Sequence, residues 1–169
     1  MSQMHEKIIT RLQEIESAES VRILYACESG SRAWGFASTD SDYDVRFIYL
    51  RPVDWYLSID MERRRDVIEY PIQGLLDING WDLRKALNLL RRGNPPLVEW
   101  LGSPIVYITR YTLAERMQAL AMQHYHPIAA LYHYLHMAQG NYRDYLKGGD
   151  RLAQEILLRP APAAGYQVD

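Results

Sequence analysis

An apolar run that ends in a small, polar turn is the feature of this sequence that most restricts its fold. Residues 21–27 read Val-Arg-Ile-Leu-Tyr-Ala-Cys, a short and almost continuously apolar segment that is typical of an inner β-strand. The chain then passes directly into Glu-Ser-Gly-Ser at 28–31. A second β-prone run, 42–50, follows a group of turn-forming residues at 38–41. The sequence therefore predicts a strand, a glycine turn and a second strand that begins with two acids.

The rest of the chain divides into a short β-prone part and a longer helical part. Apolar residues recur at helical spacing over 4–18, 82–92, 97–101, 111–123 and 127–147. Further strands are predicted at 67–70 and 72–78, with Pro71 at an edge or bulge, a turn at 79–82 and a surface loop at 51–64. We expect an α+β fold in which 1–80 form an N-terminal helix and a small mixed sheet, 81–158 form a helical region packed on it, and 159–169 form a tail.

Composition excludes several classes of protein. The 169 residues are 48% hydrophobic and 24% charged, as in an ordinary folded protein. A formal net charge of −2 gives no general attraction to a polyanion, so any contact with nucleic acid must be local. The single cysteine, Cys27, cannot form an internal disulfide, and no apolar stretch is long enough for a signal peptide or a membrane span. We expect a cytoplasmic protein with no membrane partner.

Three carboxylates form the first candidate site. Asp42 and Asp44 lie two positions apart at the start of a predicted strand, so both side chains project to the same face. Two such charges repel unless the strand end is solvated or a divalent cation lies between them, and Mg²⁺ prefers oxygen ligands. Asp77 is predicted at the end of another strand, from which it can converge on the first two. An isolated Asp-x-Asp is most often a solvated turn; the third carboxylate favours a metal site.

The glycine turn is the second candidate site. Gly30 allows backbone N–H groups to approach a ligand, and the Ser31 hydroxyl can donate to a phosphate oxygen. An ordinary β-turn would explain the same two residues. Arg32 lies inside this turn, and Arg46 alternates onto the carboxylate face of its strand, so either can neutralise a carboxylate or contact a phosphate. Glu28, just before the turn, is either structural or a further polar residue of the site.

These segments resemble the DNA polymerase beta nucleotidyltransferase superfamily. The similarity lies in Gly-Ser-Arg-Ala-Trp-Gly-Phe-Ala-Ser at 30–38 followed by Ser-Asp-Tyr-Asp-Val-Arg at 41–46. Asp77, residues 81–87 and residues 94–101 are similar to a group of predicted bacterial and phage nucleotidyltransferases that includes members associated with RNA repair. The similarity covers about residues 20–150.

The resemblance implies a palm-like mixed sheet and a nucleotidyl-transfer reaction. The chain would transfer a nucleoside monophosphate from an NTP to an acceptor hydroxyl and release pyrophosphate, with RNA among the candidate acceptors. Two Mg²⁺ ions, or Mn²⁺, would bind Asp42, Asp44 and Asp77. Gly30 and Ser31 would hold the β and γ phosphates.

Two further assignments rest on the residues themselves. Asp77 is preferred to Asp82 as the third carboxylate because Asp82 is explained as a helix-start residue. Arg32, Arg84 and Lys85 are candidate phosphate-binding residues, although a solvated helix face explains the last two equally well.

Two alternatives share the same residues. The acceptor can be a small molecule or a protein hydroxyl, which the motif does not distinguish from RNA. A catalytically silent nucleic-acid-binding or interaction module that retains the fold is disfavoured, because clustered acids without a metal are electrostatically costly. After about residue 152 the resemblance is expected to end, which suggests a truncated or frame-shifted C-terminal end.

Overall fold

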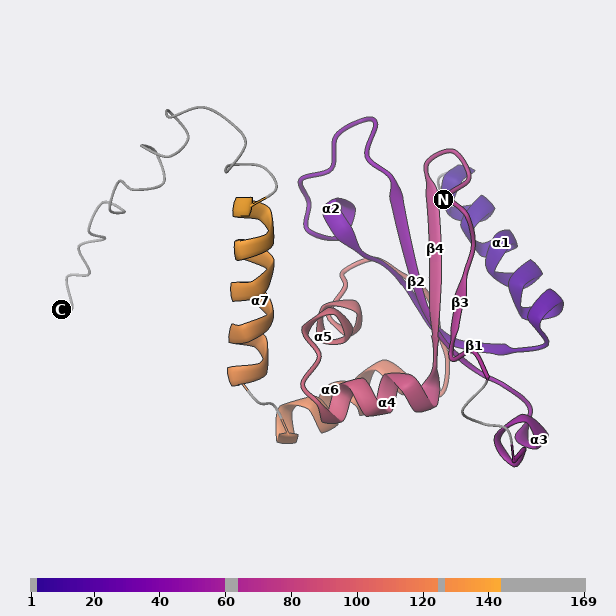
Figure 1. The fold of residues 1–169 in the computed structure, drawn as a ribbon. Helices are drawn as coiled ribbons and strands as arrows, with labels where there is room; N and C mark the ends of the chain where they lie inside the picture. The colour runs from indigo at the N-terminus through magenta and orange to yellow at the C-terminus, as the bar shows by residue number, and fades with distance from the viewer. Residues whose placement is uncertain (1–2, 60–63, 125–126, 144–169) are drawn as a thin grey trace, which may run out of the picture. The chain divides into compact units, whose positions relative to one another are not determined.

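Five strands form one mixed sheet in the computed structural model, which describes residues 3–59, 64–124 and 127–143. The strands are β1 (Arg22–Glu28), β2 (Tyr43–Leu50), β3 (Val67–Glu69), β4 (Leu76–Asp82) and β5 (Val106–Thr109), in the order β3-β4-β2-β1-β5 (Figure 1). β2 and β4 are parallel, whereas the other neighbours are antiparallel. The expected α+β class with a small mixed sheet is confirmed.

Helices cover both faces of this sheet. α1 (Gln3–Glu19) buries Ile8, Leu12 and Ile15 against one face, together with Val45, Phe47 and Tyr49 of β2. The other face packs on α4 (Leu83–Arg91), α5 (Pro95–Leu101) and α6 (Leu113–His124), whose buried residues include Ala86, Leu90, Leu97, Trp100 and Met117. Because strand side chains alternate between faces, Asp44, Arg46 and Ile48 of β2 project to the α4, α5 and α6 face.

Three short or separate helices complete the described chain. α2 (Gly30–Ala33) follows β1 directly, and α3 (Val53–Tyr56) follows β2 within the segment expected to be a loop. The chain divides into two units, Met1–Ala129 and Ala130–Asp169, and most of α7 (Pro127–Asn141) belongs to the second. The predicted tail at 159–169 lies outside the described residues.

The predicted turn at 79–82 is wrong, because these residues continue β4 in register with β2. Asn79-Gly80 is a common turn sequence, but here Gly80 lies under the ring of Phe47, and a Cβ at residue 80 would overlap that ring. The glycine thus serves close packing rather than a turn. The expected boundary near residue 80 falls inside β4, and residues 106–109, expected to be part of the helical region, supply the edge strand β5.

Gly80→Val is therefore expected to destabilise the protein by about 1–3 kcal/mol, because the new side chain forces Phe47 out of its place in the core. Urea unfolding measures the difference. Gly102→Ala is the control, because its Cβ would meet only backbone oxygens at ordinary van der Waals distance. Equal losses for the two variants would contradict the packing explanation.

Cys27 is expected to be chemically inert in the folded protein. The thiol is fully buried in β1, and burial raises its pKa to about 12. At pH 8 the thiol is therefore almost entirely protonated, whereas the thiolate is the reactive form. Iodoacetamide should label the unfolded chain at pH 8 and leave the folded chain unlabelled, with reactivity rising only toward pH 12. Rapid labelling of the folded protein at pH 8 would show that the thiol is accessible.

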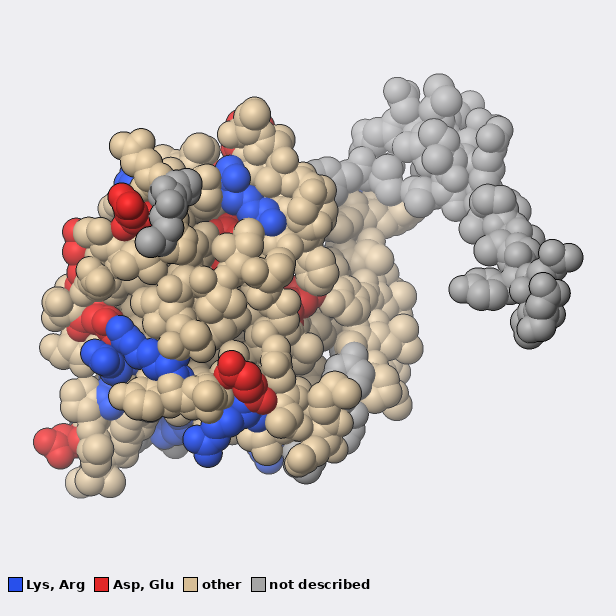
Figure 2. Space-filling model, turned by 180° about the vertical axis from the view of Figure 1, so that it is seen from behind, with Lys and Arg blue, Asp and Glu red and all other residues tan. Residues whose placement is uncertain are grey.

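Charged side chains of both signs are interspersed on the surface. Figure 2 shows small groups of basic residues next to acidic ones, and no continuous basic area on that face of the described chain. The ion pairs Arg11–Glu14, Arg110–Glu16 and Lys85–Asp66 are examples of this mixing. Among the described residues, no helix combines the length and apolar character that a membrane span requires.

Candidate active site

Asp44 and Asp77 lie side by side on the two parallel strands of the sheet. They are register partners near the beginnings of β2 and β4, and both side chains are 28% exposed. The expectation that Asp77 ends a strand is wrong, since it is the second residue of β4. The two carboxylates nevertheless meet, because parallel strands begin at the same edge of a sheet.

Arg46 joins these two carboxylates. Its Nη2 donates to Asp44 Oδ1 at 2.9 Å and to Asp77 Oδ2 at 2.7 Å, and its Nη1 donates to the carbonyls of Val45 and Asp77. One guanidinium thus neutralises half of the charge of the acidic pair. The sequence analysis predicted that Arg46 would either neutralise a carboxylate or contact a phosphate, and the structure shows the first of these contacts.

Residues 28–30 hold Asp44 on three sides. The Asp44 N–H donates to Glu28 Oε1 at 2.7 Å, and the Asp44 carbonyl accepts from the Ser29 N–H at 2.8 Å. Gly30 has a φ of +60°, and a Cβ there would overlap Asp44 Oδ2. The glycine turn predicted from the sequence therefore lies directly against one of the predicted metal ligands.

Glu28 is a buried acid behind Asp44. It is fully buried, and its second carboxylate oxygen accepts from the Tyr107 hydroxyl of β5. Burial raises the pKa of the Glu28 carboxyl, whereas the hydrogen bonds from Tyr107 and Asp44 act in the opposite direction. The sequence left Glu28 as either a structural residue or a further polar residue of the site. It did not show that the partners of this acid would be Tyr107 and the backbone of Asp44.

Asp42 and Arg32 belong to the loop that leads into β2. Asp42 precedes the strand and is exposed, which differs from the expected position on the strand. Arg32 donates to the carbonyls of Asp42 at 3.0 Å and of Ser41 at 2.6 Å, and its guanidinium stacks 3.8 Å from the centre of the Tyr43 ring. In the described structure Arg32 therefore supports the backbone that carries Asp42.

Arg84 and Lys85 are separated from the acidic pair. They follow Asp82 in the first turn of α4, at the opposite end of β4, and five strand residues place them about 16 Å from Asp77. Arg84 is exposed, and Lys85 pairs with Asp66 at 3.1 Å. Asp82 is fully buried, caps α4 by accepting from the Arg84 N–H and accepts from the Tyr56 hydroxyl. The helix-start explanation of Asp82 is confirmed.

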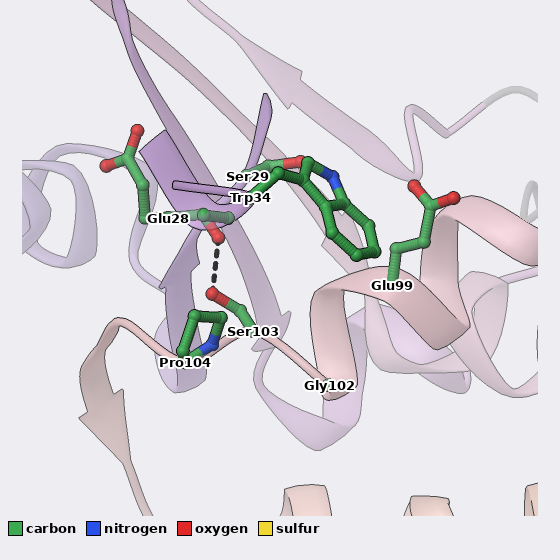
Figure 3. Close-up of a pocket in the computed structure, with 8 residues that line it drawn as sticks. Glu28, Ser29, Trp34, Glu99, Gly102, Ser103 and Pro104 are labelled. Atoms are coloured by element: carbon green, nitrogen blue, oxygen red, sulfur yellow. Dashed lines mark hydrogen bonds between the residues drawn. The ribbon is translucent and has the colours of Figure 1, made fainter. Parts of the chain in front are cut away.

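A small pocket opens beside the glycine turn. Its lining includes Trp34, at the end of α2, and Glu99, on α5, together with Ser103, whose hydroxyl donates to the Glu28 carbonyl at 2.6 Å (Figure 3). Trp34 is 61% exposed. An exposed aromatic ring beside a pocket provides a surface for stacking. Trp34 and Glu99 lie in segments that carry the family resemblance, but neither was predicted as a site residue, because the sequence does not show that both line one pocket.

The donor set at the acidic pair suits a hard divalent cation. Mg²⁺ is commonly held by one or two carboxylates, with water and phosphate oxygens as its other ligands. Asp44 and Asp77 supply two carboxylates, and the positively charged guanidinium of Arg46 already holds them together. Within residues 3–59, 64–124 and 127–143, no group of three or more His, Cys, Asp or Glu side chains is arranged to hold a metal. Asp42 does not complete such a group here.

A comparison with known families identifies the family of this chain. The family model for the RNA repair pathway DNA polymerase beta family matches residues 4–163. The chain belongs to this family. The match also shows that the expected end of the resemblance at about residue 152 is wrong, because the similarity to the family continues to residue 163.

A relative of this chain comes from Bacillus subtilis (strain 168). It is an uncharacterized protein, YcgL, and the two sequences are 55% identical over 165 residues. The alignment covers 96% of this chain and 63% of that relative, so the chain spans less than two thirds of the relative's length. No solved structure matches the chain.

Proposed function

We propose that this chain is a metal-dependent nucleotidyltransferase that transfers a nucleoside monophosphate from an NTP to an acceptor hydroxyl, with release of pyrophosphate. The observation that carries the proposal is the register pairing of Asp44 with Asp77 directly beside Gly30. Membership of a polymerase beta family supports the same reaction class. We propose RNA as the acceptor, since the family is described as part of an RNA repair pathway.

In this proposal the three carboxylates of the site bind the metal ions. Asp44 and Asp77 would hold Mg²⁺, which supplies Lewis-acid stabilisation of the phosphates and of the attacking oxygen when it is bound. Asp77 would also accept the proton of the acceptor hydroxyl. Asp42, on a loop held by Arg32, would join the site when the NTP is bound, and this would bring in a second ion.

The glycine turn would bind the triphosphate. Because Gly30 lacks a side chain, phosphate oxygens can approach the backbone beside Asp44, and the Ser31 hydroxyl can donate to them. Arg32 would reach the phosphates only by leaving the carbonyls of Ser41 and Asp42. The positions of Arg84 and Lys85 do not favour a phosphate role for them, so they are left out of this proposal.

The test is an incubation of the full chain with each α-labelled NTP and Mg²⁺ or Mn²⁺, against RNA, DNA, protein and small hydroxyl compounds in separate reactions. Label is expected on RNA ends, with pyrophosphate released in equal amount and no transfer in EDTA. Label on protein or on a small molecule would retain the reaction class and replace the acceptor. If the protein neither binds Mg²⁺–NTP nor transfers label to any acceptor, the chain is a binding module with a nucleotidyltransferase fold.

A further inference from the structure

Arg46 occupies the position between Asp44 and Asp77 where the proposed function requires a cation. Its Nη2 contacts one oxygen of each carboxylate, at 2.9 and 2.7 Å, and its side chain is 18% exposed. Both carboxylates remain open enough to exchange this partner for another, since each is 28% exposed. We propose that Arg46 is the counter-ion of Asp44 and Asp77 when no metal is bound, and that it gives way to the metal and then binds a phosphate of the NTP.

Charge balance explains why the site needs such a residue. Two carboxylates held as register partners on adjacent strands repel each other, and the guanidinium reduces their charge from −2 to −1. A divalent cation at the same pair would face the positive charge of Arg46 at close range. The guanidinium and the metal therefore compete for the acidic pair, and the free protein binds metal less tightly than the two carboxylates alone would.

The guanidinium and the proposed triphosphate site adjoin the same carboxylate, that of Asp44. Arg46 contacts Asp44 through Oδ1, whereas Gly30 lies against Oδ2 of the same carboxylate. The proposed triphosphate site and the guanidinium are thus on two sides of one carboxyl group. A guanidinium offers a planar fork of N–H donors that suits phosphate oxygens, so the charge released by the metal is placed to stabilise the triphosphate. This inference rests on the proposed function.

Replacing Arg46 separates the two roles, because they change two measurements in opposite directions. Arg46→Gln is expected to bind Mn²⁺ about tenfold more tightly than the original protein when no nucleotide is present, because a competing charge has been removed. The same variant is expected to bind Mg²⁺ with inorganic tripolyphosphate about tenfold more weakly. Electron paramagnetic resonance measures free Mn²⁺, and calorimetry measures tripolyphosphate binding. Arg91→Gln, which removes an exposed arginine from the end of α4, is the control for net charge.

Arg46→Lys provides a second test if the glutamine variant does not fold. Lysine keeps the positive charge but lacks the planar fork, so Mn²⁺ affinity should stay within about threefold while tripolyphosphate affinity falls. Weaker or unchanged Mn²⁺ binding in Arg46→Gln would overturn the proposal and leave Arg46 as a residue that only orients the carboxylates. Unchanged tripolyphosphate binding in both variants would also overturn it.

The proposed function fails in a different way. In that case replacing Asp77 would not change the Mn²⁺ binding of the original protein. The Arg46 variants would then also show no change in Mn²⁺ binding, because there would be no metal site for the arginine to compete for. Asp77-dependent Mn²⁺ binding with no effect of Arg46 would retain the metal site and remove only the role given to the arginine.

Discussion

Asp77→Asn is expected to reduce nucleotidyl transfer on the order of a thousandfold, with little change in stability. Asparagine has the shape of aspartate, but it lacks the charge that holds a divalent cation and the ability to accept a proton. The substitution also removes the ion pair between Arg46 and residue 77, so that Asp44 is the one carboxylate of the pair that still neutralises Arg46. Initial rates of label transfer from the NTP, together with urea unfolding, measure the two effects.

Asp82→Asn is the matched control, since Asp82 lies at the other end of the same strand. Asparagine can still cap α4, but it replaces the charged acceptor of the Tyr56 hydroxyl, so a loss of about 1 kcal/mol in stability is expected. The folded fraction should keep its activity. If Asp82→Asn abolished transfer while Asp77→Asn retained it, the choice of Asp77 as the third carboxylate would be wrong.

The part of this site around Gly30 and Asp44 was predictable because it depends on short-range patterns. The apolar strand before Gly30 and the acids at the start of the next strand are each contained in a few consecutive residues. Strand alternation then predicted correctly that Arg46 lies on the carboxylate face. The amphipathic pattern of α4 and its cap at Asp82 were also readable, because capping is a local interaction.

Features that depend on contacts distant in sequence were not predictable in the same way. Asn79-Gly80 matches a turn by composition, and only the ring of Phe47, from another strand, explains why a glycine stands within β4. The strand β5 has four residues and weak alternation, and its pairing with β1 defines it. Arg84 and Lys85 were grouped with the site by charge, whereas the length of β4 places them at its far end.

Gly30→Ala is expected to reduce transfer at least a hundredfold, through two effects that can be separated. The residue has a φ of +60°, a conformation that costs a side-chain-bearing residue about 1–2 kcal/mol. In addition, a Cβ at this position would overlap Asp44 Oδ2 and displace the carboxylate from its place beside Asp77 and Arg46. Displacements of about 1 Å at a reacting group commonly cost about a hundredfold in rate.

Gly35→Ala isolates the second effect. Gly35 lies just after α2, which begins at Gly30, and it has a φ of +77°, but nothing would contact its Cβ. Both alanine variants should lose a similar amount of stability in urea unfolding, whereas only Gly30→Ala should lose Mn²⁺ binding and transfer. This comparison separates backbone strain from displacement of Asp44, because the strain is common to both positions and the carboxylate is adjacent to only one. Equal transfer rates of the two variants would mean that Asp44 can shift without loss of activity. The close contact between Gly30 and Asp44 would then not be needed for the proposed mechanism.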